Sequence, residues 1–262
     1  MKVLVIGAGG VIGRRVVPLL SPSFELVLAD RKAGEIDGRE IQGLDITDLD
    51  EVRAAMRGVD AVVHLAIASQ REYVTDTASF LRDEGGEYLR FNEAMIDVNV
   101  RGTYHVFEAA REAGVKRVVL ISSLTIYLGK PHYESFHDGL PPRPSNIYAV
   151  TKLWGEQLGE YFSRRDGMTV YCLRYGDPYP QDNPKKIEDW RRRPPGRRLV
   201  VTYEDIAGSI ECALTKQGGP AYGAYTILSA CDDPIFDSSK AAEIGWKSKT
   251  RCEADGSITP VP

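Results

Sequence analysis

The N-terminal stretch restricts the possible folds of this chain more than any other part of its sequence. Residues 2–6, Lys-Val-Leu-Val-Ile, form a short β-branched run without polar alternation, which is typical of a strand buried on both faces. The run leads into a glycine turn, Gly7-Ala-Gly-Gly10-Val-Ile-Gly13, and a helical pattern then continues to residue 20, before Pro22. Strand, glycine turn and helix in this order let the backbone approach a pyrophosphate at the positive end of the helix. The sequence therefore predicts dinucleotide binding.

The acid that ends the next predicted strand supports this interpretation, because a glycine triplet alone can be merely a tight turn. Asp30 follows the strand 25–29 and lies 17 residues beyond Gly13, close to the spacing at which a carboxylate binds the adenosine ribose hydroxyls. A carboxylate there would repel a 2′-phosphate, so NAD is favoured over NADP. Arg31 and Lys32 follow immediately; they are either solvated turn residues or cations that pair with a phosphate.

Strand and helix patterns alternate through the first 175 residues, which predicts a Rossmann-like α/β fold with a doubly wound parallel sheet. Further strands are predicted to end near residue 44 and to cover 60–66, 116–122, 168–175 and 224–228; helices are predicted over 49–56, 88–113, 146–163 and 202–215. Ligands gather at the carboxyl ends of parallel strands. The cofactor contacts predicted on this ground are Gly7, Gly10, Val11, Ile12, Gly13, Asp30, Arg31, Asp45, Ile46, Leu65 and Ala66.

Individual roles follow for three of the residues near these strand ends. Asp45 is expected to accept a hydrogen bond from the adenine amino group, and Ile46 to pack against the ring. Asp48 is expected to cap the helix that follows it. His64, a lone histidine in an apolar strand, is interpreted as a core residue rather than a catalytic one.

A serine, a tyrosine and a lysine form the candidate catalytic group. Tyr148 and Lys152 are four residues apart and therefore lie on one helical face, while Ser123 ends a predicted strand. A free phenol titrates near about 10, so it is a poor base unless a nearby cation favours the phenolate. Lys152 can supply that cation, and Ser123 can hydrogen-bond the oxygen on which Tyr148 acts. The group suits proton transfer at a hydroxyl or carbonyl oxygen.

Composition and charge exclude several classes of function. A net charge of −4 gives no general attraction to nucleic acid or to an anionic membrane, and no apolar run reaches about 18 residues. The sequence also lacks a signal-peptide pattern, so a cytoplasmic location is expected. No metal site is expected, because the four cysteines are widely spaced without a C-x-x-C pair and are interpreted as reduced thiols: Cys172, Cys212, Cys231 and Cys252.

Three segments between and after the predicted elements allow more than one interpretation. Residues 69–86 are polar and form either a lid over the site or a surface excursion without function. Residues 176–196 are rich in proline and are expected to be a loop; the basic run over 191–198 is either solvated or captures an anionic group of a substrate. The tail from residue 254 to 262 is expected to be frayed.

Taken together, the motifs resemble the short-chain dehydrogenase/reductase superfamily, in its extended branch of sugar epimerases and dehydratases. The resemblance covers about residues 1 to 175. It implies that Tyr148 is the general acid/base, that Lys152 holds the nicotinamide ribose and lowers the pKa of Tyr148, and that Ser123 aligns the substrate oxygen. The motifs that carry it are Gly7-x2-Gly10-x2-Gly13, Asp30, Asp45-Ile46, His64-Leu65-Ala66, Asn99-x2-Gly102, Ser122-Ser123 and Tyr148-x3-Lys152, and it adds Asn99, Tyr148 and Lys152 to the cofactor contacts.

Within this branch the layout is most similar to the compact uronate dehydrogenases, whose length is close to that of this chain. The resemblance implies an NAD-dependent oxidoreductase acting on a sugar or sugar-acid hydroxyl, with residues 176–262 as a small substrate-binding region rather than an independent domain. The residue that corresponds to their serine after the Arg-x-Gly strand end is Asp177 here, and its charge would repel a uronate unless a cation intervenes. Lys185 or Lys186 is the nearest candidate for that cation, and a neutral aldose or sugar lactone relative is the other candidate substrate. The predicted substrate contacts are Ser69, Ser123, Thr125, Asp177 and Lys185.

Two other functions and the assembly complete the expectations. The enzymatic alternative is an epimerase or dehydratase that returns the hydride to its own intermediate, and the alternative of another class is a non-catalytic NAD sensor. The resemblance also implies a homodimer formed by the long helix through Asn99 and the Tyr148 helix. Leu153, Leu158 and Phe162 are too apolar to be all exposed, which fits a contact on the Tyr148 helix.

Overall fold

An eight-stranded sheet forms the centre of the molecule in the computed structural model, which describes residues 1–69, 86–129, 135–179, 183–193, 198–232 and 234–261. The β-branched runs pair as parallel neighbours of β1, with β2 on one side and β5 on the other. The strand order reverses at β1, which is the position where ligands bind in open sheets of this kind. In spatial order the strands are β10 (Tyr222–Ile227), β7 (Thr169–Tyr175), β6 (Arg117–Ser123), β5 (Ala61–His64), β1 (Lys2–Ile6), β2 (Glu25–Asp30), β4 (Arg39–Gly43) and β3 (Gly34–Ile36).

One edge of the sheet departs from the predicted parallel arrangement. β3 and β4 form an antiparallel hairpin, in which Ile36 faces Arg39 across a two-residue turn. Both turn residues, Asp37 and Gly38, have positive φ angles, of 49° and 73°. This backbone twist matches that of a hairpin, and Asp-Gly is a favoured sequence for it. The Asp37-Gly38 turn could therefore have been recognised in the sequence, but the prediction of strict strand–helix alternation did not include this hairpin.

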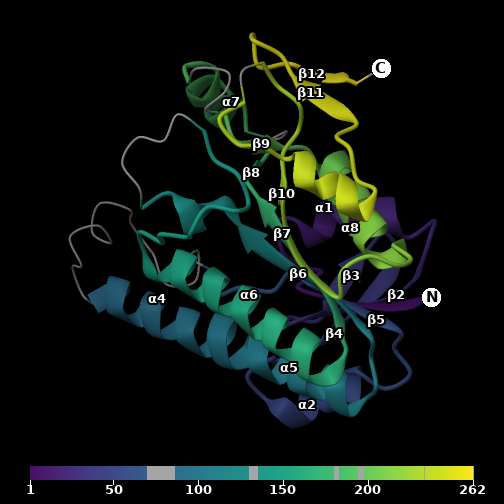
Figure 1. Cartoon of the computed structure of the whole chain (residues 1–262). Coiled ribbons are helices and arrows are strands. Elements are labelled where there is room, and N and C mark those ends of the chain that lie inside the picture. The colour runs from purple at the N-terminus through teal and green to yellow at the C-terminus, as the bar shows by residue number, and fades with distance from the viewer. Residues whose placement is uncertain (70–85, 130–134, 180–182, 194–197, 233, 262) are drawn as a thin grey trace.

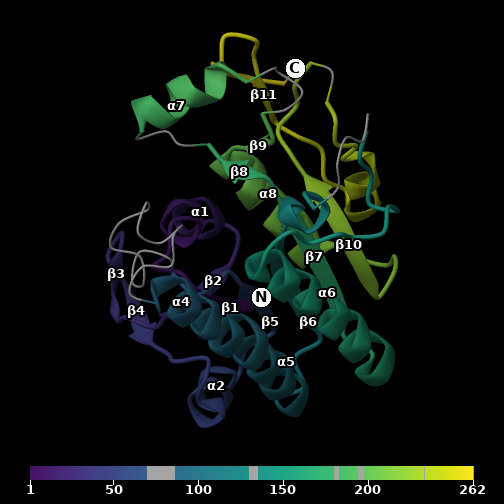
Figure 2. The same cartoon turned by 90° about the vertical axis from the view of Figure 1, so that its left-hand side faces the viewer.

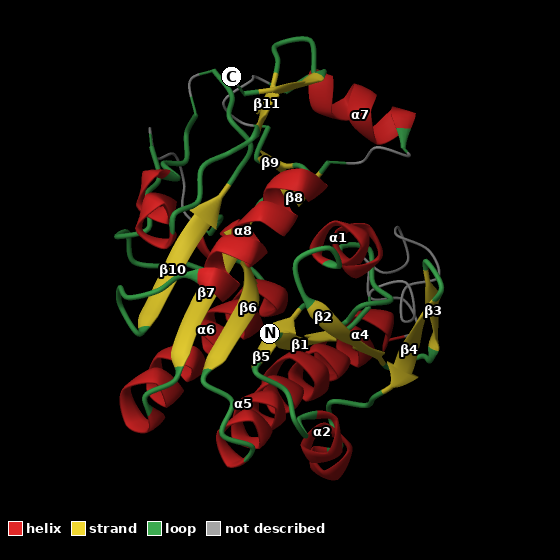
Figure 3. Ribbon diagram, turned by 90° about the vertical axis from the view of Figure 1, so that its right-hand side faces the viewer, coloured by secondary structure: helices red, strands yellow, loops and turns green. Residues whose placement is uncertain are grey.

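Helices cover both faces of the sheet, as a doubly wound fold requires (Figures 1 and 3). One core, built around Val17 and Ile210, lies under α1 (Gly13–Leu20) and α8 (Tyr203–Thr215). The other, built around Phe107 and Phe162, lies under α2 (Leu49–Ala55), α5 (Thr103–Glu112) and α6 (Ile147–Asp166). The predicted α/β class is confirmed, and the ribbon shows the two helical layers on opposite sides of the strands.

Side-chain caps set the starts of three helices close to the predicted positions. Asp48 accepts hydrogen bonds from Asp50 and Glu51 at the start of α2, Asn146 accepts one from Ala149 at α6, and Thr202 accepts one from Asp205 at α8. Each cap satisfies backbone N–H groups that have no partner inside the helix. Among the described residues, no helix is both long and apolar enough to cross a membrane.

The long helix predicted through Asn99 is not α-helical throughout. It consists of α4 (Glu87–Met95), a π-helical segment η3 (Ile96–Gly102) and α5 in direct succession. A π segment inside an α-helix frequently marks a functional position. Here it contains Asn99, and Gly102 in the same segment leaves room for Ile46, whose side chain would be 2.6 Å from a Cβ at position 102.

The chain after residue 175 is partly built into the central sheet. β10 extends the sheet beyond β7, and α8 packs beneath it. The predicted loop over 176–196 contains a helix, α7 (Pro184–Arg191). The predicted frayed tail over 254–262 instead contains a strand, β12 (Ile258–Pro260), which pairs with β11 (Thr250–Cys252) just before the tail. These elements gather at one end of the molecule, above the sheet, together with the pair β8 (Asp177–Pro178) and β9 (Val200–Val201) (Figure 2).

Candidate cofactor and active site

The glycine turn lies against the end of β5, and its two outer glycines are required by space. Gly7 has a φ of 89°, and a Cβ there would lie 2.6 Å from the amide nitrogen of Ala66 and 2.8 Å from the carbonyl carbon of Leu65. A Cβ at Gly13 would lie 2.4 Å from the carbonyl oxygens of Gly7 and Ala8. The turn therefore brings the end of β1 beside Leu65 and Ala66, as expected for a shared cofactor edge.

The start of α1 offers backbone donors to an anion. Among the described residues, no hydrogen-bond partner accepts from the amides of Val11 and Ile12, while the amides of Gly10 and Arg14 bond to Gly7 and Gly10. The side chain of Val11 is 61% exposed, so this end of the helix is open. Free N–H groups at a helix N-terminus bind phosphate, and this arrangement fits the pyrophosphate of NAD.

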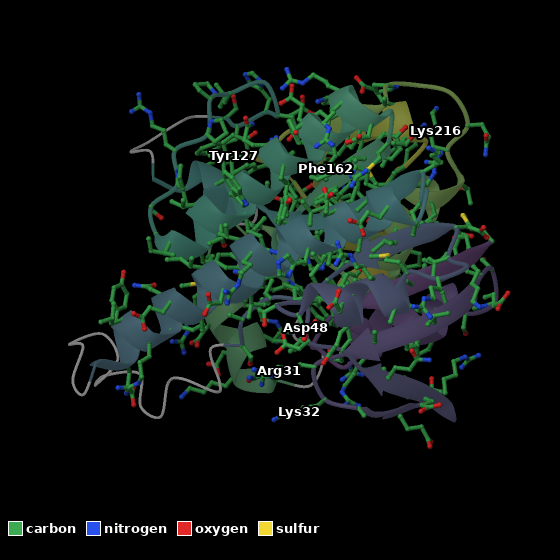
Figure 4. The ribbon with its side chains drawn as sticks, turned by 90° about the horizontal axis from the view of Figure 1, so that it is seen from below. Arg31, Lys32, Asp48, Tyr127, Phe162 and Lys216 are labelled. Carbon is green, nitrogen blue, oxygen red and sulfur yellow. The ribbon has the colours of Figure 1, made fainter. Side chains whose placement is uncertain are left out.

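Asp30 is held against the same turn. Its Oδ2 accepts a hydrogen bond of 2.9 Å from the amide of Gly9, which leaves Oδ1 for a ribose hydroxyl. Arg31 and Lys32 are exposed beside it and lie far from Tyr127 in Figure 4. The carboxylate thus lies where the sequence spacing predicted.

The predicted adenine contacts are brought near one another, with Ile46 more enclosed than expected. The Oδ1 atom of Asp45 accepts from both the amide and the hydroxyl of Thr47, each at 2.8 Å. Asp45 lines a hollow of about 620 Å³ together with Arg31. Ile46 is buried against Gly102 of the π segment.

Asn99 connects the segment that follows β5 to the Tyr148 helix. Its Oδ1 accepts from the amide of Ala68 at 2.8 Å, and its Nδ2 donates to Thr151 Oγ1 at 3.0 Å. Thr151 in turn donates to the carbonyl oxygen of Tyr148 at 2.8 Å. Ser69, the predicted substrate contact after Ala68, is exposed at the edge of the described range. The proposed lid over 69–86 lies outside the described residues except for its ends.

His64 behaves as the core residue that the sequence indicated. It is buried, and its Nε2 lies 3.1 Å from Thr103 Oγ1, whereas its Nδ1 has no partner among the described residues. Burial lowers the pKa of His64 to about 3, and the charge of Lys152 adds to this effect. The imidazole is therefore neutral at physiological pH.

Ser123, Tyr148 and Lys152 come together at the carboxyl end of β6. The Nζ of Lys152 donates to the carbonyl oxygen of Ile121 at 2.8 Å and lies 5.7 Å from the centre of the Tyr148 ring. Ser123 Oγ accepts from the amide of Thr125 at 3.2 Å and from its hydroxyl at 3.1 Å. Because both contacts use Ser123 as an acceptor, its own proton remains available to the Tyr148 hydroxyl, with which it is hydrogen-bonded.

Burial dominates the protonation of this group. It raises the pKa of Tyr148, while the hydrogen bond from Ser123 lowers it and the charge of Asp177 raises it further. Burial lowers the pKa of Lys152 to about 8, against the opposing effect of Glu156. The phenol is thus protonated and the lysine mostly charged at neutral pH in the protein alone.

Asp177, whose charge raises the pKa of Tyr148, forms an ion pair with Arg193. Asp177 Oδ2 is 3.6 Å from the Nη1 of Arg193, and both side chains are about half exposed. Arg193 follows α7 and belongs to the basic run that the sequence suggested for capture of an anion. Lys185, one of the two lysines predicted as the nearest cation, is exposed on α7, and no contact with the site is found for it among the described residues.

A buried ionic network behind the site was not anticipated. Arg174 binds Glu156 through two hydrogen bonds of 2.8 and 2.6 Å, and binds Asp138 Oδ1 at 2.9 Å. Glu156 also accepts from Ser122 at 2.6 Å. The available signal was an arginine within the apolar strand Tyr-Cys-Leu-Arg-Tyr, since a buried charge needs partners.

No metal centre is apparent in the part of the chain that the structure describes. No group of three or more His, Cys, Asp or Glu side chains there is arranged to hold an ion.

Comparison with known proteins gives consistent results. The family whose sequence pattern matches, over residues 3–194, is described as the NAD dependent epimerase/dehydratase family. The NAD-dependent glucose-6-phosphate dehydrogenase of Haloferax volcanii is 31% identical over 231 residues, covering 81% of this chain and 79% of its own. The uronate dehydrogenase of Pseudomonas syringae pv. tomato is 26% identical over 262 residues, covering 96% and 83%.

A solved structure shares the fold and contains the cofactor. A mutant uronate dehydrogenase from Agrobacterium tumefaciens, complexed with NAD, is 26% identical and aligns with a TM-score of 0.76, covering 95% of this chain and 85% of that one.

Proposed function

The chain belongs to the NAD dependent epimerase/dehydratase family, and from this membership and the site we propose that it oxidises a hydroxyl group of a sugar or sugar acid with NAD. The observation that carries the proposal is the convergence of Ser123, Tyr148 and Lys152 at the same carboxyl edge of the sheet as a glycine turn whose free amides suit a pyrophosphate. Bound NAD supplies the acceptor for the hydrogen and electron pair that leave the carbon.

The protein's own groups position the hydroxyl and take its proton. Tyr148, as phenolate, accepts the proton, and Ser123 donates a hydrogen bond to the same substrate oxygen. Lys152 holds the nicotinamide ribose and places a positive charge near the phenolate. Burial raises the pKa of the Tyr148 phenol and so disfavours the phenolate. The phenol therefore becomes an effective base only when Ser123, Lys152, the cofactor and the substrate are all in place. Residues 176–262 contribute the substrate side of the site, through Asp177 and Arg193.

The test is NADH formation, followed by absorbance, with NAD and a panel of uronates, neutral aldoses and sugar 6-phosphates. The panel includes carboxylate and phosphate sugars because relatives of this chain are named as a uronate dehydrogenase and a glucose-6-phosphate dehydrogenase. Turnover of any of these compounds supports the proposal. No turnover in the whole panel, together with NAD that stays bound through purification, would instead favour the epimerase or dehydratase reaction, which releases no NADH.

The pair of Asp177 and Arg193 is proposed to set the charge preference for the substrate. Arg193→Met is expected to lower kcat/KM for an anionic sugar about tenfold or more and to affect a neutral aldose much less, because a charged hydrogen bond contributes roughly 1.5–3 kcal/mol. Arg192→Met is the matched control, since Arg192 pairs with Glu188 instead. Equal losses for charged and neutral sugars would contradict this role.

Asp30 is proposed to select NAD. Asp30→Asn keeps an oxygen that can accept from Gly9 but removes the charge, so the KM for NAD is expected to rise about tenfold while the preference against NADP weakens. Steady-state kinetics with both cofactors measures the effect, and Glu40→Gln, on the exposed part of β4, is the control. An unchanged cofactor ratio would show that Asp30 does not read the ribose.

The protein is proposed to be a homodimer, although through different residues from those named from the sequence. Leu158 and Phe162 are buried in the protomer's own core, and Leu153 packs in a small cluster near Leu124. The α4–η3–α5 run and α6 lie side by side (Figure 1). Exposed apolar side chains on these helices are Tyr88, Leu89, Ile96 and Tyr104 on the α4–η3–α5 run and Val150, Trp154 and Tyr161 on α6.

Trp154→Arg is expected to convert the dimer to a monomer, because it places a charge in the centre of this apolar surface. Light scattering coupled to size-exclusion chromatography measures the mass. Leu19→Arg, at a similarly exposed position on α1, should leave the dimer intact. A wild-type protein that is monomeric at micromolar concentration would refute the proposed assembly.

A further inference from the structure

Two of the four thiols lie next to each other beyond the end of β10. Ala230 and Arg251 form a parallel bridge, in which the amide of Ala230 donates to Thr250 at 3.0 Å and that of Cys252 donates to Ala230 at 2.7 Å. Cys231 and Cys252 are the next residues on the two segments, so they are neighbours on the same side of this bridge. Adjacent strands lie about 4.8 Å apart, within the Cα separation of about 4.4–6.8 Å that a disulfide spans.

The side chains of this pair share one enclosure. Both line a cavity of about 210 Å³ that is bounded by residues 198–200, 228–231 and 234–238. Both also belong to the small apolar cluster around Trp190 and Val200. Cys252 is buried, whereas Cys231 is partly exposed. The Cys231 thiol can therefore react with a small molecule from solvent, while the Cys252 thiol is buried next to it.

A buried arginine gives the inner thiol a cationic neighbour. Arg198 is 5% exposed and donates to the carbonyl oxygens of Arg191, Arg193 and Glu253 at 3.0, 3.0 and 2.8 Å. No carboxylate among the described residues forms an ion pair with it, and its guanidinium also hydrogen-bonds the Cys252 thiol. A buried guanidinium without a carboxylate partner is stabilised by a nearby anion, and a cation next to a cysteine favours the thiolate.

The charges around the two sulfurs act in both directions. Burial raises the pKa of Cys231 and of Cys252, and Arg198 lowers both. Arg251 lowers that of Cys231, while Asp232 raises it; Glu253 and Asp255 raise that of Cys252. Because burial is the largest of these effects, both thiols are mainly protonated at neutral pH, so the exchange should be slow there and should become faster as the pH rises.

We propose that Cys231 and Cys252 form a reversible dithiol–disulfide site, oxidised by a low-molecular-weight disulfide of the glutathione type. The Cys231 thiolate attacks one sulfur of the oxidant, forms a mixed disulfide and releases one thiolate. The Cys252 thiolate, beside Arg198, then attacks the Cys231 sulfur and releases the second. Two cysteine thiols and one disulfide become one protein disulfide and two free thiols, whose protons come from the cysteines.

The bond would connect the C-terminal hairpin to the end of β10. Because Arg198 also holds the carbonyl oxygens at the end of α7, the thiol site is joined by direct contacts to the segment that carries Arg193. Oxidation should thus make the end of the molecule that carries the proposed substrate contacts more rigid, and should raise the midpoint of thermal unfolding.

The experiment exposes the full-length protein to oxidised glutathione and maps its peptides without reduction. We expect a linked pair of peptides containing Cys231 and Cys252, reversed by dithiothreitol, with a raised unfolding midpoint. In Cys252→Ser, Cys231 should retain one glutathione; in Cys231→Ser, Cys252 should remain a free thiol. Cys212→Ser, which removes a partly exposed thiol elsewhere, should still form the link.

Three results would overturn the proposal: both thiols remaining reduced in the wild type, each carrying its own glutathione, or a link that includes Cys212 or Cys172. The readouts are independent of turnover, so this proposal can fail while the proposed enzymatic function stands, and the converse is equally possible.

Discussion

Tyr148→Phe is expected to lose about 10²- to 10⁴-fold in turnover while still binding NAD, which is the range that a positioned general base contributes. The substitution removes one oxygen from a side chain whose ring stays between the same neighbours. Ser123 would lose its partner, but the glycine turn, Asp30 and Asn99 would be unchanged. The effect should therefore fall on kcat, with the affinity for NAD measured by calorimetry nearly unaltered.

The pH dependence of the wild type provides a second readout of the same group. Because burial raises the pKa of Tyr148, the phenolate is the minor form at neutral pH, and the rate of sugar oxidation should increase as the pH rises above neutrality. The residual activity of Tyr148→Phe should lack this increase.

Tyr161→Phe is the matched control, since Tyr161 lies on the same helix and its hydroxyl accepts a hydrogen bond from Arg165 on the protein surface. It should retain wild-type turnover and the wild-type pH profile. If Tyr148→Phe kept full turnover, the enzymatic reading would be wrong and a non-catalytic NAD sensor would become the better interpretation.

Arg174→Met is expected to cost about 3–5 kcal/mol of unfolding free energy, because it leaves two buried carboxylates without their cation. Glu156 and Asp138 each have side chains that are 2% exposed where they meet Arg174. Arg174 Nη1 also donates to the Tyr127 hydroxyl at 2.6 Å. Urea denaturation measures the loss.

Arg117→Met is the control for this second prediction. Arg117 is half-buried on β6, and its guanidinium donates to the carbonyl oxygens of Ala213 and Lys216 rather than to carboxylates. Its removal leaves no buried carboxylate without a cation, so the expected loss of unfolding free energy is smaller, about 1–3 kcal/mol. Equal losses for the two arginines would contradict the ionic explanation.

The double variant Arg174→Met with Glu156→Met separates the charge effect from lost packing. Replacing both partners of a buried pair by apolar side chains is often far less costly than removing one. The double variant should therefore be more stable than Arg174→Met alone. The turnover of the double variant should be lower than that of the wild type, because Glu156 holds Ser122, the neighbour of Ser123, and lies one helical turn beyond Lys152.

Local patterns in the sequence were sufficient to predict the doubly wound fold and the edge of its sheet at which the cofactor is proposed to bind. The strand over residues 2–6, the glycine turn and Asp30 could be predicted because their requirements are local: a buried run, room for a backbone approach and a fixed spacing. The Tyr148–Lys152 pair followed from helical periodicity. The Asp37-Gly38 hairpin could also have been predicted, since its turn signal is just as local.

Predictions that depended on which side chains are buried were less successful. Leu158 and Phe162 are apolar, but whether they face the protomer's own core or a partner depends on the rotation of α6 against β7. The role of Asp177 depended on a nearby cation, and the candidates from the sequence were Lys185 and Lys186. The cation in contact is Arg193, because α7 and β8 bring the two together across intervening chain.

By itself the sequence determined a doubly wound fold, a candidate dinucleotide site at its N-terminal turn and the three residues proposed for proton transfer, since each follows from short-range spacing. Only the tertiary structure decided the π segment at Asn99, the ionic network behind Ser123, the Asp177–Arg193 pair and the neighbouring thiols Cys231 and Cys252. Those contacts join residues distant in the chain, and their distances are set by the packing of whole strands and helices, which no short stretch of sequence contains.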